Sequence, residues 1–262
     1  MTSLPEYLQI GGQQLEFSWH GPPPSQAPTL VFLHEGLGSV KLWRDFPQAL
    51  AQATGCGALV YSRAGYGNSS AVPLPRPVTY LHHEAQEVLP QVLAQCEVRE
   101  FVLVGHSDGG SIALIYAGSV AHPGLLGVIT EAAHVFVEDV TVRGVQAARE
   151  AYLSGDLRAR LARHHAQVDV AFSGWNDTWL SPSFRDWNLE KFLPGIQVPL
   201  LVLQGEDDEY GTPKQVQAIV SQVSGPAEGH LLPGCGHTPH REAREAVLHA
   251  MTAFMQQLVP GS

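Results

Sequence analysis

Short apolar runs separated by helical segments are the feature that most constrains the fold of this 262-residue chain. Each run is rich in Val, Leu or Ile and lacks the polar alternation of a strand that has one face in water. The runs lie at residues 29–33, 58–61, 101–104, 126–130 and 199–203. Apolar residues recur at helical spacing in the segments 43–54, 80–95, 215–223 and 241–258. This alternation predicts an α/β fold with a mostly parallel central sheet and helices on both of its faces.

The amino-terminal part predicts a smaller unit, a β-hairpin. Residues 7–10 and 15–19 both have strand character, and they flank a turn at Gly11-Gly12. The length of the chain fits one large α/β domain or two small ones. Because 44% of the residues are hydrophobic and 15% are charged, a sizeable core is expected and disorder is not.

One long segment interrupts the alternation of strands and helices. Residues 134–193 contain no strand-like run, and they are too many for an ordinary connection between strands. Two helices are expected within the segment, around 145–153 and 157–167. We interpret it as an inserted helical cap, so that residues 1–133 and 194–262 form the two parts of the core domain.

The cap segment is rich in aromatic residues. Trp175, Trp179 and Trp187 are candidates to contact a substrate from above the core. The alternative is that these rings form a small core within the cap, since buried aromatic side chains mostly pack against each other.

The charge and the cysteines bear on partners and location. The formal net charge is −10, whereas nucleic acids and anionic membranes require a basic surface, so neither is expected as a partner. The first residues, Met-Thr-Ser-Leu-Pro-Glu-Tyr-Leu, lack the pattern of a secretory signal, and no apolar run is long enough to cross a bilayer. Cys56, Cys96 and Cys235 are widely separated and predict no disulfide framework. A cytoplasmic location is therefore expected.

The sequence Gly-His-Ser-Asp-Gly at 105–109 is the strongest indication of chemistry. It lies between the predicted strand at 101–104 and an apolar helical run at 111–117, which is the context of the Gly-x-Ser-x-Gly nucleophile elbow. Such a turn exposes the hydroxyl of Ser107 and directs the N–H of Asp108 into the same space. The alternative is a glycine-rich turn without chemistry.

A serine hydroxyl needs a base to act as a nucleophile. His237 follows Gly236 in a loop after the last predicted strand, which fits the chain order serine, acid, histidine. His240 is the rival candidate. The pairs His82-His83 and His164-His165 are expected to be mostly solvated, and no metal site is expected because they lack the spacing of metal ligands.

The base in turn needs a carboxylate to orient it. Four acidic residues follow the predicted strand at 199–203, in the sequence Gly-Glu-Asp-Asp-Glu at 205–209. Asp208 is the preferred candidate and Asp207 the second. Glu131, at the end of the preceding predicted strand, is a further alternative.

An acyl-transfer site also needs hydrogen-bond donors for the oxyanion. By its position, the backbone N–H of Asp108 is one donor. The second is expected from the loop His-Glu-Gly-Leu-Gly at 34–38, where Gly36 is the candidate and Leu37 the alternative. His34, at the start of this loop, is a candidate substrate contact.

These pieces together resemble the α/β-hydrolase family. The matching motifs lie at residues 34–38, 62–69, 105–110, 205–208 and 236–237. The resemblance implies the α/β-hydrolase fold and a triad of Ser107, Asp208 and His237. Two residues depart from the family pattern, since Glu35 stands where the family usually has Gly, and Ser62 where it usually has Asp. The serine at position 107 argues against relatives such as haloalkane dehalogenases and epoxide hydrolases, which use an aspartate nucleophile.

The resemblance implies a serine hydrolase that cleaves a small or medium carboxylic ester, or a related lactone or thioester, through an acyl-enzyme. No metal or organic cofactor is expected, and the expected partner is a small acyl substrate. A C–C bond hydrolase of ring-cleavage products is an alternative, and a hydrolase-like binding protein without turnover is an alternative of another class. The sequence Ser-Asp-Gly-Gly is also similar to that of amino-acid-ester hydrolases, in which the acid after the serine is implicated in holding a substrate amine, a role that would fall to Asp108.

Overall fold

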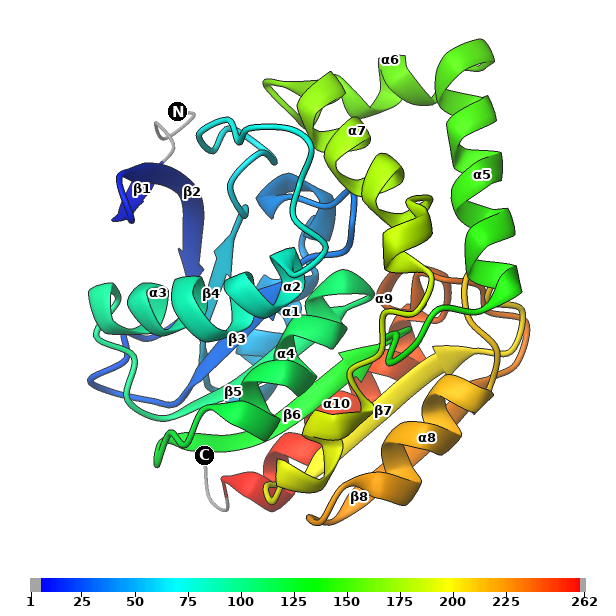
Figure 1. Ribbon diagram of the computed structural model, residues 1–262. Coiled ribbons are helices and arrows are strands. Elements are labelled where there is room, and N and C mark those ends of the chain that lie inside the picture. The colour runs from blue at the N-terminus through cyan, green and yellow to red at the C-terminus, as the bar shows by residue number, and fades with distance from the viewer. Residues whose placement is uncertain (1–5, 260–262) are drawn as a thin grey trace.

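The computed structural model describes residues 6–259, which form an eight-stranded sheet with helices on both faces (Figure 1). The strand order is β1-β2-β4-β3-β5-β6-β7-β8. Strand β2 is antiparallel to both of its neighbours, and the remaining pairs are parallel. The strands are β1 (Glu6–Ile10), β2 (Gln13–His20), β3 (Thr29–Leu33), β4 (Gly57–Tyr61), β5 (Phe101–His106), β6 (Leu125–Glu131), β7 (Leu200–Gly205) and β8 (Ala227–Leu232). The predicted α/β fold with a mostly parallel sheet is thus confirmed.

Each of the five predicted runs corresponds to one strand within two residues at either end, and the predicted hairpin is β1 and β2. Strand β8 was not predicted. It lies at the edge of the sheet, and its side chains, in the sequence Ala-Glu-Gly-His-Leu-Leu, are mostly exposed. An edge strand of this kind needs no continuous apolar run, so the pattern that identifies buried strands does not detect it.

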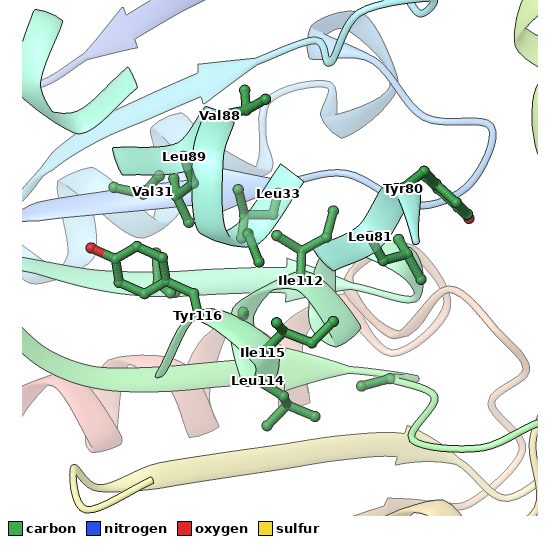
Figure 2. Packing of buried hydrophobic residues seen from close by; sticks show 14 of the residues in the cluster. Val31, Leu33, Tyr80, Leu81, Val88, Leu89, Ile112, Leu114, Ile115 and Tyr116 are labelled. Carbon is green, nitrogen blue, oxygen red and sulfur yellow. The ribbon is translucent and has the colours of Figure 1, made fainter. Parts of the chain in front are cut away.

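Two helical layers enclose the sheet. Helices α1 and α10 pack on one face with Phe32, Val104 and Leu203, while α2, α3, α4 and α8 cover the other face. Figure 2 shows part of the second layer, in which Leu33 of β3 and Ile112 of α4 belong to one buried cluster. The helices of the core are α1 (Phe46–Thr54), α2 (Tyr80–His83), α3 (Leu89–Gln95), α4 (Asp108–Ser119), α8 (Lys214–Gln222), α9 (Pro239–Glu242) and α10 (Arg244–Leu258), with 3₁₀ turns at η1 (Val40–Trp43) and η4 (Glu190–Gly195).

The predicted helix at 80–95 is helical throughout, but its hydrogen-bond spacing changes in the middle. Between α2 and α3 lies a π-helical stretch, η2 (Glu84–Val88). Pro90 stands in the first turn of α3 and has no N–H to donate. A proline at this place is a physical reason for the altered hydrogen-bond spacing just before it.

The segment between β6 and β7 holds α5 (Asp139–Ser154), α6 (Leu157–Leu161), α7 (Val168–Trp179) and the turn η3 (Pro182–Phe184). Helices α5 to α7 lie beyond the carboxyl ends of β6 and β7 (Figure 1). The predicted helix at 145–153 lies inside α5. The predicted helix at 157–167 is wrong after residue 161, and α7 was not predicted. We retain residues 134–193 as the proposed cap between the core segments 1–133 and 194–262.

Three other expectations concern membrane spans, the cysteines and a secretory signal. Among residues 6–259, no helix is long and apolar enough to cross a membrane. Cys56, Cys96 and Cys235 are all free thiols. The expectation about a secretory signal falls largely on residues 1–5, which lie outside the described residues.

Candidate active site

Ser107 occupies a tight turn between the end of β5 and the start of α4. Its backbone has φ 52° and ψ −115°, a conformation that L-residues rarely adopt. The turn is possible because its neighbours are glycines. A Cβ on Gly105 would lie 2.3 Å from the carbonyl oxygen of Gly109, and a Cβ on Gly109 would lie 1.9 Å from the carbonyl oxygen of Leu33. The geometry is that of a nucleophile elbow, as the motif predicts.

Three side chains distant in sequence meet at this turn. The Nε2 atom of His237 lies 3.0 Å from Ser107 Oγ, and the Nδ1 atom lies 2.8 Å from Asp208 Oδ1. A carboxylate only accepts hydrogen bonds, so Nδ1 carries the proton and Nε2 is free to accept the serine proton. The structure thereby brings together the three residues that the sequence proposed as a triad.

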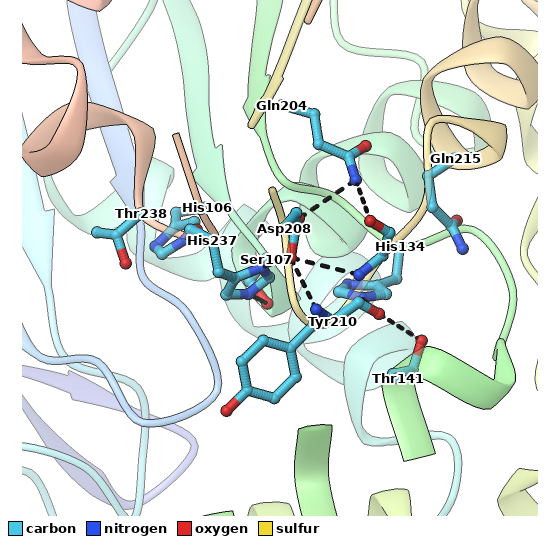
Figure 3. Close-up of polar contacts among 12 residues, drawn as sticks. His106, Ser107, His134, Thr141, Gln204, Asp208, Tyr210, Gln215, His237 and Thr238 are labelled. Carbon is cyan, nitrogen blue, oxygen red and sulfur yellow. Dashed lines mark hydrogen bonds and ion pairs between the residues drawn. The ribbon is translucent and has the colours of Figure 1, made fainter. Parts of the chain in front are cut away.

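Asp208 is held by donors on several sides (Figure 3). Its Oδ1 accepts hydrogen bonds from the N–H groups of Tyr210 (2.8 Å) and Gly211 (3.3 Å) as well as from His237, and its Oδ2 accepts one from Gln204 Nε2 (3.2 Å). Burial by itself would raise the pKa of Asp208, but His237 and the N–H of Tyr210 more than offset burial and lower it. The carboxylate is therefore ionised and fixed in place.

The competing residues are placed elsewhere. Asp207 is exposed to solvent. Glu131 is buried, and its Oε2 accepts hydrogen bonds from the backbone N–H (2.8 Å) and Nδ1 (3.0 Å) of His240. Glu131 and His240 thus form their own pair, which leaves Asp208 as the carboxylate that contacts His237.

His134 lies next to His237, and the sequence pattern did not identify it as a site residue. Its Nε2 donates to the carbonyl of Tyr210 (3.1 Å), which also accepts a hydrogen bond from Thr141 Oγ1 (2.6 Å). Burial, followed by the nearby His237, lowers the pKa of His134, so the ring is neutral. It fixes the backbone that supports Asp208. The available signal was its position shortly after the carboxyl end of β6.

The backbone N–H groups of Gly36 and Asp108, two residues that line the same cavity as Ser107, have no hydrogen-bond partner among the described residues. The carbonyl of Glu35 is held by His34 Nδ1 (2.7 Å) and Arg63 (2.9 Å). Because a trans peptide is planar, the N–H of Gly36 in the same peptide unit points the opposite way from this carbonyl. The side chains of His34 and Arg63 thus orient the Gly36 N–H.

A cavity of about 390 Å³ opens over Ser107. Gly36 and Leu37 line one part of it, and Trp175 and Trp179 from α7 line another. A Cβ on Gly36 would lie only 2.3 Å from the indole of Trp175, so this ring packs directly over the glycine. Two of the three predicted tryptophans therefore face the cavity.

The structure does not bring two predicted contact residues to this cavity. His34 is fully buried, and its Nε2 accepts a hydrogen bond from the backbone N–H of Arg63 (3.0 Å). Trp187 stacks on Phe184 at a centroid distance of 5.3 Å and packs in the aromatic cluster behind Trp179. Neither ring lines the cavity above Ser107.

His165 also departs from expectation, because it is buried rather than solvated. Its Nδ1 accepts a hydrogen bond from the N–H of Gly67 (3.0 Å), and its Nε2 donates to the carbonyl of Leu37 (2.9 Å). These bonds tie the segment after α6 to the loop that carries Gly36. Its sequence neighbour His164 is half-buried. The described residues contain no cluster of His, Cys, Asp and Glu that could hold a metal ion.

One carboxylate oxygen of Asp108 has partners inside the protein. Its Oδ2 accepts a hydrogen bond from Tyr80 Oη (2.6 Å) and lies 3.8 Å from the Arg63 guanidinium. Trp179 Nε1 donates to the same Tyr80 oxygen (3.0 Å), so α7 is linked to the elbow. Arg63 compensates the charge of Asp108, while the other carboxylate oxygen, Oδ1, is buried and has no hydrogen-bond partner among the described residues.

Other charged groups along the cavity are mostly paired. Glu35 lies 3.5 Å from Nδ1 of His106, and Arg160 lies 3.3 Å from Asp156. Glu209, the remaining acid of the lining, is exposed to solvent. The interior of the cavity therefore carries little net charge.

Comparisons with known proteins agree with this architecture. Residues 30–250 match the Alpha/beta hydrolase family, and the chain belongs to that family. The 2-succinyl-6-hydroxy-2,4-cyclohexadiene-1-carboxylate synthase of Salmonella enteritidis PT4 is 25% identical over 270 residues, which cover 90% of this chain and 97% of the synthase.

Solved structures show the same fold. The crystal structure of VinJ superimposes with a TM-score of 0.79 at 24% identity and covers 98% of this chain and 99% of its own. The enol-lactonase from Burkholderia xenovorans LB400 has a TM-score of 0.71 at 19% identity, with 96% and 100% covered. Family membership supports hydrolase-like catalysis without specifying the bond that is cleaved.

Proposed function

We propose that this protein is a serine hydrolase that cleaves small or medium carboxylic esters, or related lactones or thioesters, through an acyl-enzyme. The observation that carries the proposal is the hydrogen-bonded series Ser107–His237–Asp208 at the floor of the cavity. The unpartnered N–H groups of Gly36 and Asp108 beside it supply the two donors that an oxyanion requires.

The reaction follows from this geometry. Ser107 Oγ attacks the substrate carbonyl carbon while His237 Nε2 takes the hydroxyl proton. Asp208 stabilises the imidazolium that forms, and the two N–H groups bind the oxyanion. His237 then protonates the departing alcohol or thiol. In the second half, water attacks the acyl-enzyme, His237 takes its proton, and the carboxylic acid leaves as the proton returns to Ser107 Oγ.

The cavity indicates an uncharged substrate of modest size. Its volume of about 390 Å³ lies at the lower end of the range for small-molecule sites. The indoles of Trp175 and Trp179 provide apolar surface, and the charged groups of the interior are paired. These features support a neutral acyl compound with an apolar or aromatic part. We further propose that a small acyl substrate is the only partner required, and that the protein binds neither nucleic acid nor a membrane. We also propose a cytoplasmic location.

A second candidate reaction comes from the relatives named as synthases, because their match spans nearly the whole chain. The product in that name carries a carboxylate, so its binding calls for cationic side chains. Apart from the histidines, the cationic side chain that lines this cavity is that of Arg160. It is exposed and already pairs with Asp156. We therefore favour the ester over this reaction and over C–C cleavage of ring-cleavage products.

Two measurements test the proposal. Labelling with a fluorophosphonate shows whether Ser107 is activated, and a substrate screen over aryl esters, lactones, thioesters, amides, a dienoate ketone and carboxylate-bearing substrates shows which bond is cleaved. We expect Ser107→Ala to abolish labelling and ester turnover, whereas Ser221→Ala, which changes an exposed serine at the end of α8, leaves both unchanged. Absence of labelling in the unaltered protein would instead support a binding protein without turnover.

A further inference from the structure

Glu35 is the residue of the loop 34–38 that departs from the family pattern, and the structure shows what it contacts. Its Oε2 lies 3.5 Å from Nδ1 of His106, an ion-pair distance. Gly38 makes room for this arrangement, because a Cβ there would lie 2.3 Å from Glu35 Oε2. The carboxylate is thus folded back toward the end of β5, against the residue that precedes Ser107.

Both nitrogens of His106 face oxygen atoms that only accept hydrogen bonds. Nε2 lies 2.6 Å from the backbone carbonyl of His237, so it must carry a proton. If Nδ1 were unprotonated, its lone pair would face the Glu35 carboxylate. Nδ1 makes no hydrogen bond among the described residues, so the charge of the Glu35 carboxylate at 3.5 Å is what favours an imidazolium, with one proton on each nitrogen, for this fully buried ring.

The charges around His106 support this protonation state. The groups that face it are Glu35 on the loop after β3, Glu131 at the end of β6, His240 on α9 and His237 on the preceding loop. Burial by itself would lower the pKa of His106, but Glu35, Glu131 and the His237 carbonyl raise it to about 9. The same contact with His106 holds the pKa of Glu35 well below its usual range, although burial alone would raise it.

Three parts of the candidate site meet at this pair. His106 directly precedes Ser107, Glu35 directly precedes Gly36, and the carbonyl that His106 binds belongs to His237. Accepting the serine-hydrolase function proposed above, we propose that the His106 imidazolium and Glu35 are positioning residues. They join the loop 34–38, which carries the Gly36 N–H, to the loop that carries His237. The imidazolium also compensates the Glu35 carboxylate, which would otherwise oppose an oxyanion forming beside Gly36.

The first experiment measures the protonation of His106 directly and does not depend on turnover. Long-range ¹H–¹⁵N spectra of the histidine rings are recorded against pH for the unaltered protein, Glu35→Gln and His106→Gln, the last of which identifies the His106 signals. We expect an imidazolium at neutral pH that titrates near the pKa of about 9, and an earlier titration in Glu35→Gln by about one pH unit or more. If His106→Gln does not fold, backbone assignment identifies the signals instead.

The second experiment measures the kinetic effect with an aryl ester identified in the substrate screen. Glu35→Gln and His106→Gln should each lower kcat about tenfold with little change in KM, and the double variant should lose no more than the worse single variant, because the two residues act as one unit. The alkaline limb of the kcat profile should move to lower pH in Glu35→Gln, since full activity depends on the protonated ring. Asp207→Asn, which changes an exposed acid, is the control and should leave the profile unchanged.

The outcomes separate this inference from the proposed function. A neutral His106 ring at pH 7, or a titration that Glu35→Gln does not move, would overturn the inference even if the protein hydrolyses esters. Additive losses in the double variant, or an unmoved alkaline limb, would also overturn it. If the histidine titration is as expected but Ser107 is neither labelled nor needed for turnover, the proposed function fails instead.

Discussion

Replacing Asp208 with Asn removes one charge from the triad while keeping the size of the side chain. In the unaltered protein the carboxylate lies 2.8 Å from His237 Nδ1, and its side chain is 1% exposed, so solvent does not screen it. At an effective dielectric constant of about 20, a unit charge pair at this distance is worth ~6 kcal/mol in the state where His237 is protonated. At about 1.4 kcal/mol per factor of ten, the expected loss in kcat is about 10⁴-fold.

The hydrogen bonds of Asp208 add to this loss. An amide offers one acceptor atom where the carboxylate offers two, and Gln204 Nε2 already donates to Oδ2. In one orientation of the Asp208→Asn amide, its NH₂ group would face the NH₂ group of Gln204, so that two donors meet. In the other orientation, its NH₂ group would face His237 Nδ1 and enforce the wrong tautomer of the base. Both arrangements reduce kcat rather than substrate binding.

The assay is the steady-state hydrolysis of an aryl ester at saturating substrate, with the acylation burst measured by stopped flow. Asp207→Asn is the matched control, because Asp207 is adjacent in sequence but exposed, and its activity should stay within about twofold. Thermal melting checks that both variants are folded. Retention of more than a tenth of the kcat in Asp208→Asn, or an equal loss in Asp207→Asn, would refute the assignment of Asp208.

Three further predictions concern the loop, the cavity wall and the buried Glu131–His240 pair. Gly36→Ala should lower kcat about 100-fold because its methyl group overlaps the Trp175 indole, and an unchanged kcat would contradict the oxyanion role. Trp179→Phe should raise KM for aromatic esters several-fold, whereas Trp187→Phe, outside the cavity, should leave KM unaltered; equal effects would contradict the placement of the cavity. Glu131→Gln should reduce the free energy of unfolding by about 3 kcal/mol at neutral pH because it breaks a buried pair. The pKa of Glu131 is lowered by His240 despite burial, so its stabilising contribution is present above the ordinary value of 4.5 and is lost as the pH falls below that value. Urea unfolding at neutral and acid pH should therefore show the difference between the two proteins shrinking in acid, and a constant difference would argue against an ionised Glu131.

Local sequence patterns were enough to predict the parallel strands, the turn at Ser107 and the candidate base. The apolar runs fixed the parallel strands, because a strand buried on both faces needs such side chains whatever its neighbours are. The glycines at 105 and 109 fixed the turn at Ser107, since a Cβ at either would collide with backbone. His237 followed from the order of the motifs along the chain. Strand β8 and helix α7 escaped detection, because an exposed edge strand and a helix packed within the insertion carry weaker periodic signals.

The tertiary structure alone decided which of several chemically equivalent groups meet. A carboxylate is present on each of Asp207, Asp208 and Glu131. Only the packing of the loop after β7 places the carboxylate of Asp208 against His237. The sequence marked Glu35 as a departure from the family without giving it a role, and the role that we propose for it depends on His106, 71 residues further along the chain. The physical reason is that backbone conformation follows from neighbouring residues, whereas protonation and hydrogen bonding follow from whichever groups the fold brings within about 3 Å of each other.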